Sequence, residues 1–135
     1  MSQSGIRKAL VAALEALSLG IPLNYPNNPV KTATDGSCGD VSFVWNRPEV
    51  FTLGDNGEDL HTGFCQVLLK FPSGKGDSTL LQKADLIREG FSAGSRKFYL
   101  TQEVVIENCG MGEYDTLDGK FVCPITIYWY AKTRR

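Results

Sequence analysis

The first residues that could do chemistry form a glycine and lysine loop at residues 73–79. This segment reads SGKGDST and joins a strand-like run to a helix-like run, as a phosphate-binding loop does. A P-loop has the spacing G-x-x-x-x-G-K followed by Ser or Thr. Leu69 stands where the first glycine belongs, and Gly76 stands where the Ser or Thr belongs. The spacing therefore favours a plain glycine turn with an exposed Lys75, and small-ligand binding at Gly74, Lys75 and Gly76 is the alternative.

His61 is the only histidine, so acid–base or nucleophilic catalysis of the common kinds has to use it or carboxylates alone. It lies between an acidic turn and a strand, where an ordinary surface histidine is the simpler interpretation. The nearby carboxylates Asp55, Glu58 and Asp59 lack the ligand pattern of an EF-hand and are expected to be solvated. We therefore predict no catalytic residues, no cofactor and no metal site, and no enzyme activity.

The four cysteines, Cys38, Cys65, Cys109 and Cys123, contain no close pair of the kind that zinc or dithiol sites use. Two of them, Cys65 and Cys123, alternate with apolar residues in strand-like runs, which is typical of small buried side chains. We expect free, reduced thiols rather than disulfides. A metal site assembled from distant strands is the less favoured alternative.

Length and composition predict one globular domain over residues 1–135. The chain has 135 residues, of which 42% are apolar and 21% charged. Its 14 basic and 15 acidic side chains give a net charge of -1, which removes the electrostatic case for a dedicated binder of nucleic acid or of membrane surfaces. The apolar run at residues 9–14 ends at Glu15, and no run approaches the length of a membrane span. We expect no membrane association.

Hydrophobic periodicity predicts the elements that carry these residues. Apolar residues recur at helical spacing over residues 3–18 and again after a cap at Asp77 or Ser78. Three prolines make residues 21–29 an extended connector. Alternating apolar and polar residues predict strands at residues 41–48, 62–71, 98–107 and 120–131, with residues 50–53 as a continuation of the first strand beyond a bulge. An Asn-Gly turn joins the first two strands as a hairpin, and residues 110–119 form the turn between the last two.

The expected fold is of the α+β class, with a four-stranded, mainly antiparallel sheet, two helices on one face, and the order α-β-β-α-β-β. The last strand complicates this arrangement. Ile125, Ile127 and Trp129 fill one of its sides, while Tyr128 and Tyr130 fill the other. Both sides need burial, so further chain or another subunit has to cover the second side, and an aromatic patch of this kind favours association. Stacking of nucleic-acid bases is disfavoured because acidic residues flank the aromatic ones.

Charge is unevenly distributed despite its near-neutral sum. Residues 35–60 hold six acids and one base, a balance of -5, whereas residues 61–100 hold six bases and three acids, a balance of +3. Opposite patches suit head-to-tail contact between copies, and a solvated charged surface is the alternative. We expect the hairpin at residues 46–61 to project, lining a channel or touching a neighbour. The residues predicted at a subunit or partner interface are Arg47, Glu49, Asp55, Glu58, Asp59, Tyr128, Tyr130, Arg134 and Arg135.

Several short motifs carry a resemblance to a known family. The run NYPNNP at residues 24–29 follows the first helix, a tryptophan-bearing strand comes next, and GFCQV at 63–67 and FPSGKG at 71–76 precede the second helix. In this order they resemble the tail-terminator-like proteins of tailed bacteriophages, over residues 6–127. Val30 departs from the aromatic residue that often follows the connector. The matching positions, expected to be structural, are Tyr25, Pro26, Asn27, Pro29, Gly63, Gln66, Pro72, Gly74 and Gly76.

The resemblance implies a structural protein of the virion, made in the host cytoplasm. It implies a ring of identical subunits, expected to be a hexamer, at the head-proximal end of a phage tail. Such a ring ends growth of the tail tube and joins the tail to head-completion or neck proteins. The implied partners are the chain itself, the tail tube protein and a head-completion or neck protein. DNA passes through the lumen without specific binding, and an acidic wall would keep it from adhering. Another phage neck or connector subunit is the alternative.

Overall fold

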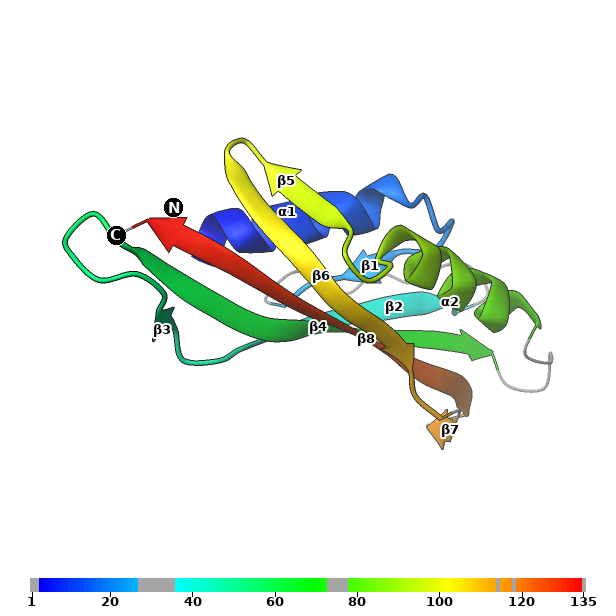
Figure 1. Cartoon of the computed structure of the whole chain (residues 1–135). Coiled ribbons are helices and arrows are strands. Elements are labelled where there is room, and N and C mark those ends of the chain that lie inside the picture. The colour runs from blue at the N-terminus through cyan, green and yellow to red at the C-terminus, as the bar shows by residue number, and fades with distance from the viewer. Residues whose placement is uncertain (1–2, 27–35, 73–77, 114, 118, 135) are drawn as a thin grey trace.

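Eight strands form one mixed sheet that curls around two helices (Figure 1). The computed structural model describes residues 3–26, 36–72, 78–113, 115–117 and 119–134. Within them, the sheet order is β1-β2-β4-β8-β6-β5, with β3 added to β4 and β7 added to β8. β1 runs parallel to β2, and the other pairings are antiparallel. The elements are α1 (Gln3–Ala16), β1 (Leu23–Asn24), β2 (Cys38–Trp45), β3 (Glu49–Val50), β4 (Glu58–Pro72), α2 (Ser78–Gly90), β5 (Arg96–Tyr99), β6 (Gln102–Met111), β7 (Asp115–Leu117) and β8 (Lys120–Arg134).

The predicted α+β class with a four-stranded sheet in the order α-β-β-α-β-β was wrong. The described chain is mostly β, and its sheet has eight strands. Three of these are short strands in segments predicted as connector, strand continuation and turn: β1, β3 and β7. Each forms against a longer neighbour, since β1 pairs with β2, β3 with β4, and β7 with β8. These strands are two or three residues long and depend on a partner strand for their hydrogen bonds, so local periodicity does not reveal them.

The predicted third strand at residues 98–107 is a hairpin made of β5 and β6. The chain reverses at Leu100 and Thr101, and Tyr99 pairs with Gln102 across the turn. Leu100 has a φ of 54°, a left-handed conformation that leucine rarely adopts. Phe98, Leu100, Val104 and Ile106 keep the phase of one strand, interrupted at polar Gln102, and the glycine or asparagine that usually marks such a turn is missing. The pattern therefore predicted one strand where the chain makes two.

The long strands β4 and β8 give the sheet a buried inner face and a more exposed outer face. Alternate side chains along both strands are buried, as the strand period of two requires. Helix α1 adds Ile6, Leu10 and Leu14 to the core on the inner face. Helix α2 adds Leu80 and Ile87 to the same core. Because each fully buried aliphatic side chain contributes about 1.5–3 kcal/mol, this core fixes both helices on the inner face.

A glycine in β4 lets two tryptophans meet on the inner face. Trp45 of β2, Gly63 of β4 and Trp129 of β8 stand directly opposite one another. Because Gly63 has no side chain, the two flanking rings come within 5.2 Å between centroids, edge to face at 72°. A Cβ at Gly63 would lie 2.2 Å from the carbonyl oxygen of Val44 and 3.0 Å from the Trp129 ring. Only glycine fits between these strands.

A shared carboxylate fastens the connector to the sheet. Asn24 of β1 donates its side-chain amide to Asp40 of β2 at 3.1 Å, and Lys70 of β4 forms an ion pair with Asp40 at 2.6 Å. Burial acts to raise the pKa of Asp40, but the hydrogen bonds from Lys70 and Asn24 outweigh it and hold the pKa below its usual value. Asp40 is therefore an ionised link between three strands.

We expect Gly63→Ala to lower the free energy of unfolding by about 1–3 kcal/mol, because the added methyl group must push β2 away from β4. Gly110→Ala in β6 is the matched control, since a Cβ there has no atom within 4 Å. Its change should stay within about 0.5 kcal/mol. Urea unfolding followed by tryptophan fluorescence measures both. Equal stability of the two variants would contradict the close packing at Gly63.

We expect Asp40→Asn to make stability less dependent on acid pH. A carboxyl whose pKa is lowered by folding contributes fully above its ordinary pKa of about 4, and this contribution is lost as the pH falls through the folded-state value. The wild-type protein and the variant should therefore differ at neutral pH and converge in strong acid in urea unfolding. Asp85→Asn on the exposed side of α2 should follow the wild type. A difference that does not change with pH would rule out the ionised link.

Candidate subunit interface

The outer face of the sheet carries a row of apolar side chains that neither helix covers. Val44 of β2, Phe64 of β4 and Tyr128 of β8 are direct register partners and form this outer row. Val44 is 42% exposed and Tyr128 44% exposed, and the Phe64 and Tyr128 rings lie 5.8 Å apart. Tyr130, two residues beyond Tyr128 on the same face of β8, is half-buried between its register partners Thr62 and Val105. The outer row is a surface suited to a protein neighbour, because large exposed apolar groups gain most from being covered.

The predicted acidic hairpin ends in a loop between β3 and β4. We call this loop, residues 51–57, the acidic loop. Glu58 accepts hydrogen bonds through its main-chain oxygen from Phe51 at 2.9 Å and Thr52 at 3.0 Å, and its own N–H donates to the Thr52 hydroxyl. The loop is nevertheless rich in exposed apolar groups, since Phe51 is 50% and Leu53 90% exposed. It lies at the end of the sheet where the C-terminus lies (Figure 1). Asp55 is exposed at its tip.

The acidic hairpin and the basic tail lie side by side in one copy of the chain. Glu58 of β4 is the register partner of Arg134 in β8, and Leu60 is the partner of Lys132. The Lys132 ammonium lies 3.9 Å from the centroid of the Phe51 ring. The acidic hairpin and the basic tail therefore meet along the β4–β8 ladder. Of the other predicted interface residues, Arg47 and Glu49 are exposed near the same hairpin, and Arg135 lies outside the described residues.

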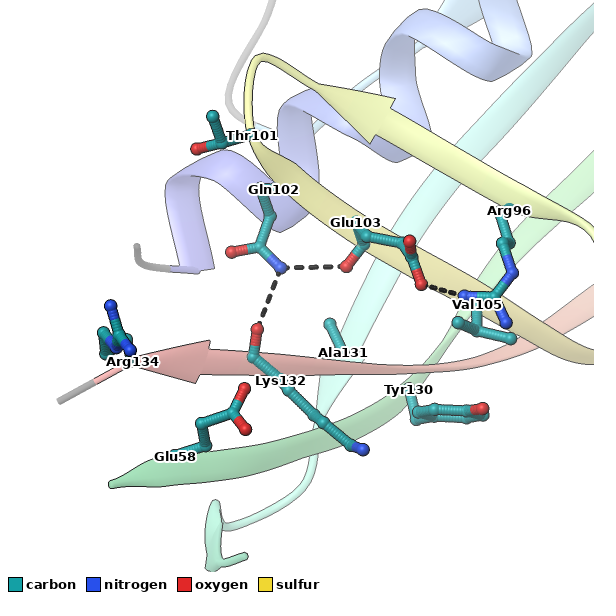
Figure 2. A pocket seen from close by; sticks show the side chains of 10 residues that line it. All are labelled: Glu58, Arg96, Thr101, Gln102, Glu103, Val105, Tyr130, Ala131, Lys132 and Arg134. Carbon is teal, nitrogen blue, oxygen red and sulfur yellow. Dashed lines mark hydrogen bonds and ion pairs between the residues drawn. The ribbon is translucent and has the colours of Figure 1, made fainter. Parts of the chain in front are cut away.

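A cavity of about 500 Å³ lies where β8 continues past the end of its ladder with β6 (Figure 2). The register between them ends at Val105 and Tyr130, so the last residues of β8 have only β4 as a strand partner in the described chain. A register shift between Ile106 and Asn108 marks a bulge, which bends β6 next to this point. We call the resulting opening the β6–β8 cleft. Its walls carry three cations and two carboxylates: Arg96, Lys132, Arg134, Glu58 and Glu103.

Gln102 closes the inner end of the β6–β8 cleft, and the sequence analysis missed it. Its side chain is 2% exposed, and its amide nitrogen donates to the main-chain oxygens of Glu103 at 2.8 Å and Lys132 at 3.2 Å (Figure 2). A flipped amide would set oxygen against two carbonyls, so this orientation is fixed. The amide oxygen has no hydrogen-bond partner among the described residues. In the sequence, Gln102 falls on the same side of the strand as the buried Val104 and Ile106. A polar residue at such a position was the feature from which a buried amide could have been predicted.

The turn beside the cleft exposes two more apolar side chains. Leu100 is 80% exposed and Phe98 58% exposed. A leucine in the left-handed region carries a backbone cost of about 1–2 kcal/mol, and its exposure adds no compensating burial. Strain of this kind at an exposed apolar tip points to a contact made outside the single chain.

The family-motif residues that the structure describes have structural positions. The Tyr25 hydroxyl donates to Glu15 at 2.7 Å, and the Arg7 guanidinium lies 5.9 Å from its ring centroid, so the connector packs against α1. Burial, and then the hydrogen bond to Glu15, raise the pKa of Tyr25. Pro26 is exposed.

In β4, Gly63 separates the tryptophans, Gln66 lies on the outer face between Ser42 and Thr126, and Pro72 is the last residue of the strand. Asn27 and Pro29 of the connector, and Gly74, Lys75 and Gly76 of the glycine loop, lie outside the described residues.

The remaining chemically active residues are packed into the sheet. His61 shares a hydrogen bond of 2.7 Å between its Nε2 and the Thr133 hydroxyl, which ties β4 to β8. All four cysteines are free, and burial raises the pKa of Cys65 to about 12 and that of Cys109 to about 11. Such thiols are poor nucleophiles at neutral pH. Among the described residues, no three His, Cys, Asp or Glu side chains converge as a metal site.

The described helices are also too short or too polar to cross a membrane.

Comparison with known proteins gives one family match. Residues 5–129 match a family model described as phage tail terminator protein. One similar solved structure, whose name carries no functional description, has a TM-score of 0.78 and 18% identity, and the alignment covers 97% of this chain and 96% of that one. Another is a chain titled virion of native gene transfer agent (GTA) particle, with a TM-score of 0.48, 14% identity, and coverage of 98% and 94%. No curated protein matches the sequence.

We expect Tyr128→Asp to weaken self-association while leaving the fold intact, because the side chain lies on the outer row, outside the core. The concentration for half-assembly should rise about tenfold or more, since a charge in an apolar contact is costly. Light scattering over a concentration series measures this, and circular dichroism checks the fold. Gln82→Asp, on the exposed side of α2, is the matched control. Unchanged association of Tyr128→Asp would exclude the outer row as a subunit contact.

Proposed function

The chain belongs to the family of phage tail terminator proteins, and from this premise we propose that it forms the ring that ends a phage tail. The predicted resemblance is confirmed by the family match, and a structural role in the phage tail goes with that family. The finer role is our proposal: a ring of identical subunits, six in number, stops growth of the tail tube at its head-proximal end. The ring then offers its other side to head-completion or neck proteins.

The family match over residues 5–129 is the observation that carries this proposal. The surfaces of the chain support it. The outer row is an apolar face that a neighbouring subunit could cover, and the hairpin end presents exposed Leu53 and Leu100 beside the charged β6–β8 cleft. A ring between two different partners needs separate lateral and axial surfaces of this kind. We assign the tail tube protein to one axial side and a head-completion or neck protein to the other.

We also assign the hairpin end to the lumen-side edge of the contact between neighbouring subunits. The segment at residues 49–59 carries four acids, Glu49, Asp55, Glu58 and Asp59, and no base. Repeated around a ring, this negative charge repels the phosphate backbone, so that DNA passes without adhering. Lys132 and Arg134 lie outside this segment, on the neighbouring strand β8.

The test is the length and capping of tail tubes assembled in vitro. Tail tube protein polymerising alone is expected to give tubes of unlimited length, and addition of this protein should stop growth. Gold-labelled protein should appear in electron micrographs at one end only. Gln82→Asp should cap as the wild type does, because this residue lies outside the proposed surfaces. A terminator role would be rejected if the label appeared along the tube or if the tubes kept growing. A connector role would be favoured if the label were confined to the neck of virions and the protein had no effect on tubes.

A further inference from the structure

We propose that the acidic loop of one copy docks in the β6–β8 cleft of the next copy, forming a head-to-tail contact around the ring. The inference rests on the proposed function for the existence of the ring, and on the cleft and loop for the contact. A second copy of this chain is therefore the occupant of the cleft.

The cleft is open to an incoming segment of main chain. β8 continues beyond Tyr130 without β6 beside it, and the Gln102 amide meets only the Lys132 carbonyl across the gap. The Gln102 oxygen is buried, has no hydrogen-bond partner among the described residues, and points away from Glu103 and Arg96 (Figure 2). An entering loop would instead meet the main chain of β8 beyond Tyr130, which has no strand partner on its β6 side among the described residues, and pairing satisfies such main-chain groups. The volume of about 500 Å³ admits a short loop.

Charge at the cleft complements the loop. Arg96 is ion-paired with Glu103, and Lys132 lies against the Phe51 ring of its own copy, which leaves Arg134 as the cation at the mouth near the C-terminal end of β8. The loop brings Asp55 at its exposed tip, and the segment around it holds no base. Opposite charges at this contact fix its register more than its strength. We therefore pair Asp55 of one copy with Arg134 of the next.

The rim of the cleft and the tip of the loop are both apolar and exposed. Leu53, at the tip, is 90% exposed, and Leu100, on the turn beside the cleft, is 80% exposed. Docking would bury these two side chains together with Phe98, and the strained left-handed turn at Leu100 would then hold an anchor in place. Two exposed leucines on separate loops at one end of the sheet thus receive a common explanation.

The sheet order makes this contact heterologous. The acidic loop joins β3 to β4 on one side of β8, whereas the cleft opens on the other side, between β8 and β6. Both lie at the end of the sheet that holds the C-terminus (Figure 1). One copy therefore presents a donor surface and a distinct acceptor surface, and contacts between unlike surfaces generate rings when the rotation closes.

Cross-linking with a short bismaleimide tests the contact. In a Cys109→Ser background, where the remaining native cysteines are buried, one variant carries Asp55→Cys and another carries Thr101→Cys at the cleft. We expect no cross-link in either variant alone, dimers in their mixture, and a ladder up to the full ring in the variant that carries both changes. Dimers from a single variant alone would show contact between like surfaces and overturn the proposal. So would the absence of cross-links in the variant with both changes, in concentrated solution and on capped tail tubes.

Charge reversal tests the assigned pair independently of cross-linking. Asp55→Lys or Arg134→Glu alone should raise the concentration for half-assembly about tenfold, and the two changes together should restore most of it. Asp85→Lys on the exposed side of α2 is the control for a change of net charge. Failure of the second change to rescue the first would reject this pairing.

The outcomes separate this inference from the proposed function. A cross-link ladder in a protein that does not cap tail tubes would retain the contact and reject the terminator role. Capping by a protein that yields no ladder would retain the role and reject the contact.

Discussion

The pairing of β4 with β8 is the constraint on which the rest of the structure depends. The two strands, each 15 residues long, are in register from Glu58 with Arg134 to Pro72 with Lys120. Because side chains alternate across a strand, so long a ladder must produce two faces. One face is covered by both helices and forms the core, and the other is left for a neighbour. A shift by one residue would exchange the faces, so this register decides both stability and function.

The same ladder creates the candidate interface. β8 remains paired with β4 to its last described residues, while β6 pairs with β8 only from Val105 onward, with a bulge between Ile106 and Asn108. The gap between them is bridged by one buried side chain, Gln102, instead of a main-chain ladder. A cleft with charged walls therefore arises where the β6–β8 ladder stops, and Glu58 of the acidic hairpin forms part of its wall. The surfaces suited to a neighbour follow from how the strands end.

The motif of the central strand also gains a physical reason. Gly63 is required because Trp45 and Trp129 meet above it and because Val44 passes too close for a side chain. Tyr25 is fastened to α1 by Glu15 and Arg7, which explains why an aromatic residue follows the first helix and turn. These residues hold strands and a helix together, and this packing role agrees with a family of phage tail proteins.

The sequence by itself determined the family, both helices, the β2–β4 hairpin and the two-sided last strand, since periodicity and short motifs are local properties of the chain. It did not determine that residues 98–107 reverse at Leu100, because the apolar residues on both sides of the turn keep the phase of one strand and only Gln102 departs from it. Nor did it determine β1, β3 and β7, which exist only where a longer strand supplies their hydrogen bonds. The nine residues predicted at an interface include members of the acidic hairpin and the basic tail. They do not include Gln102 or Leu100, and the cleft was not predicted. Those depend on which strands pair and where their ladders stop, and only the tertiary structure decides contacts between residues so far apart in the chain.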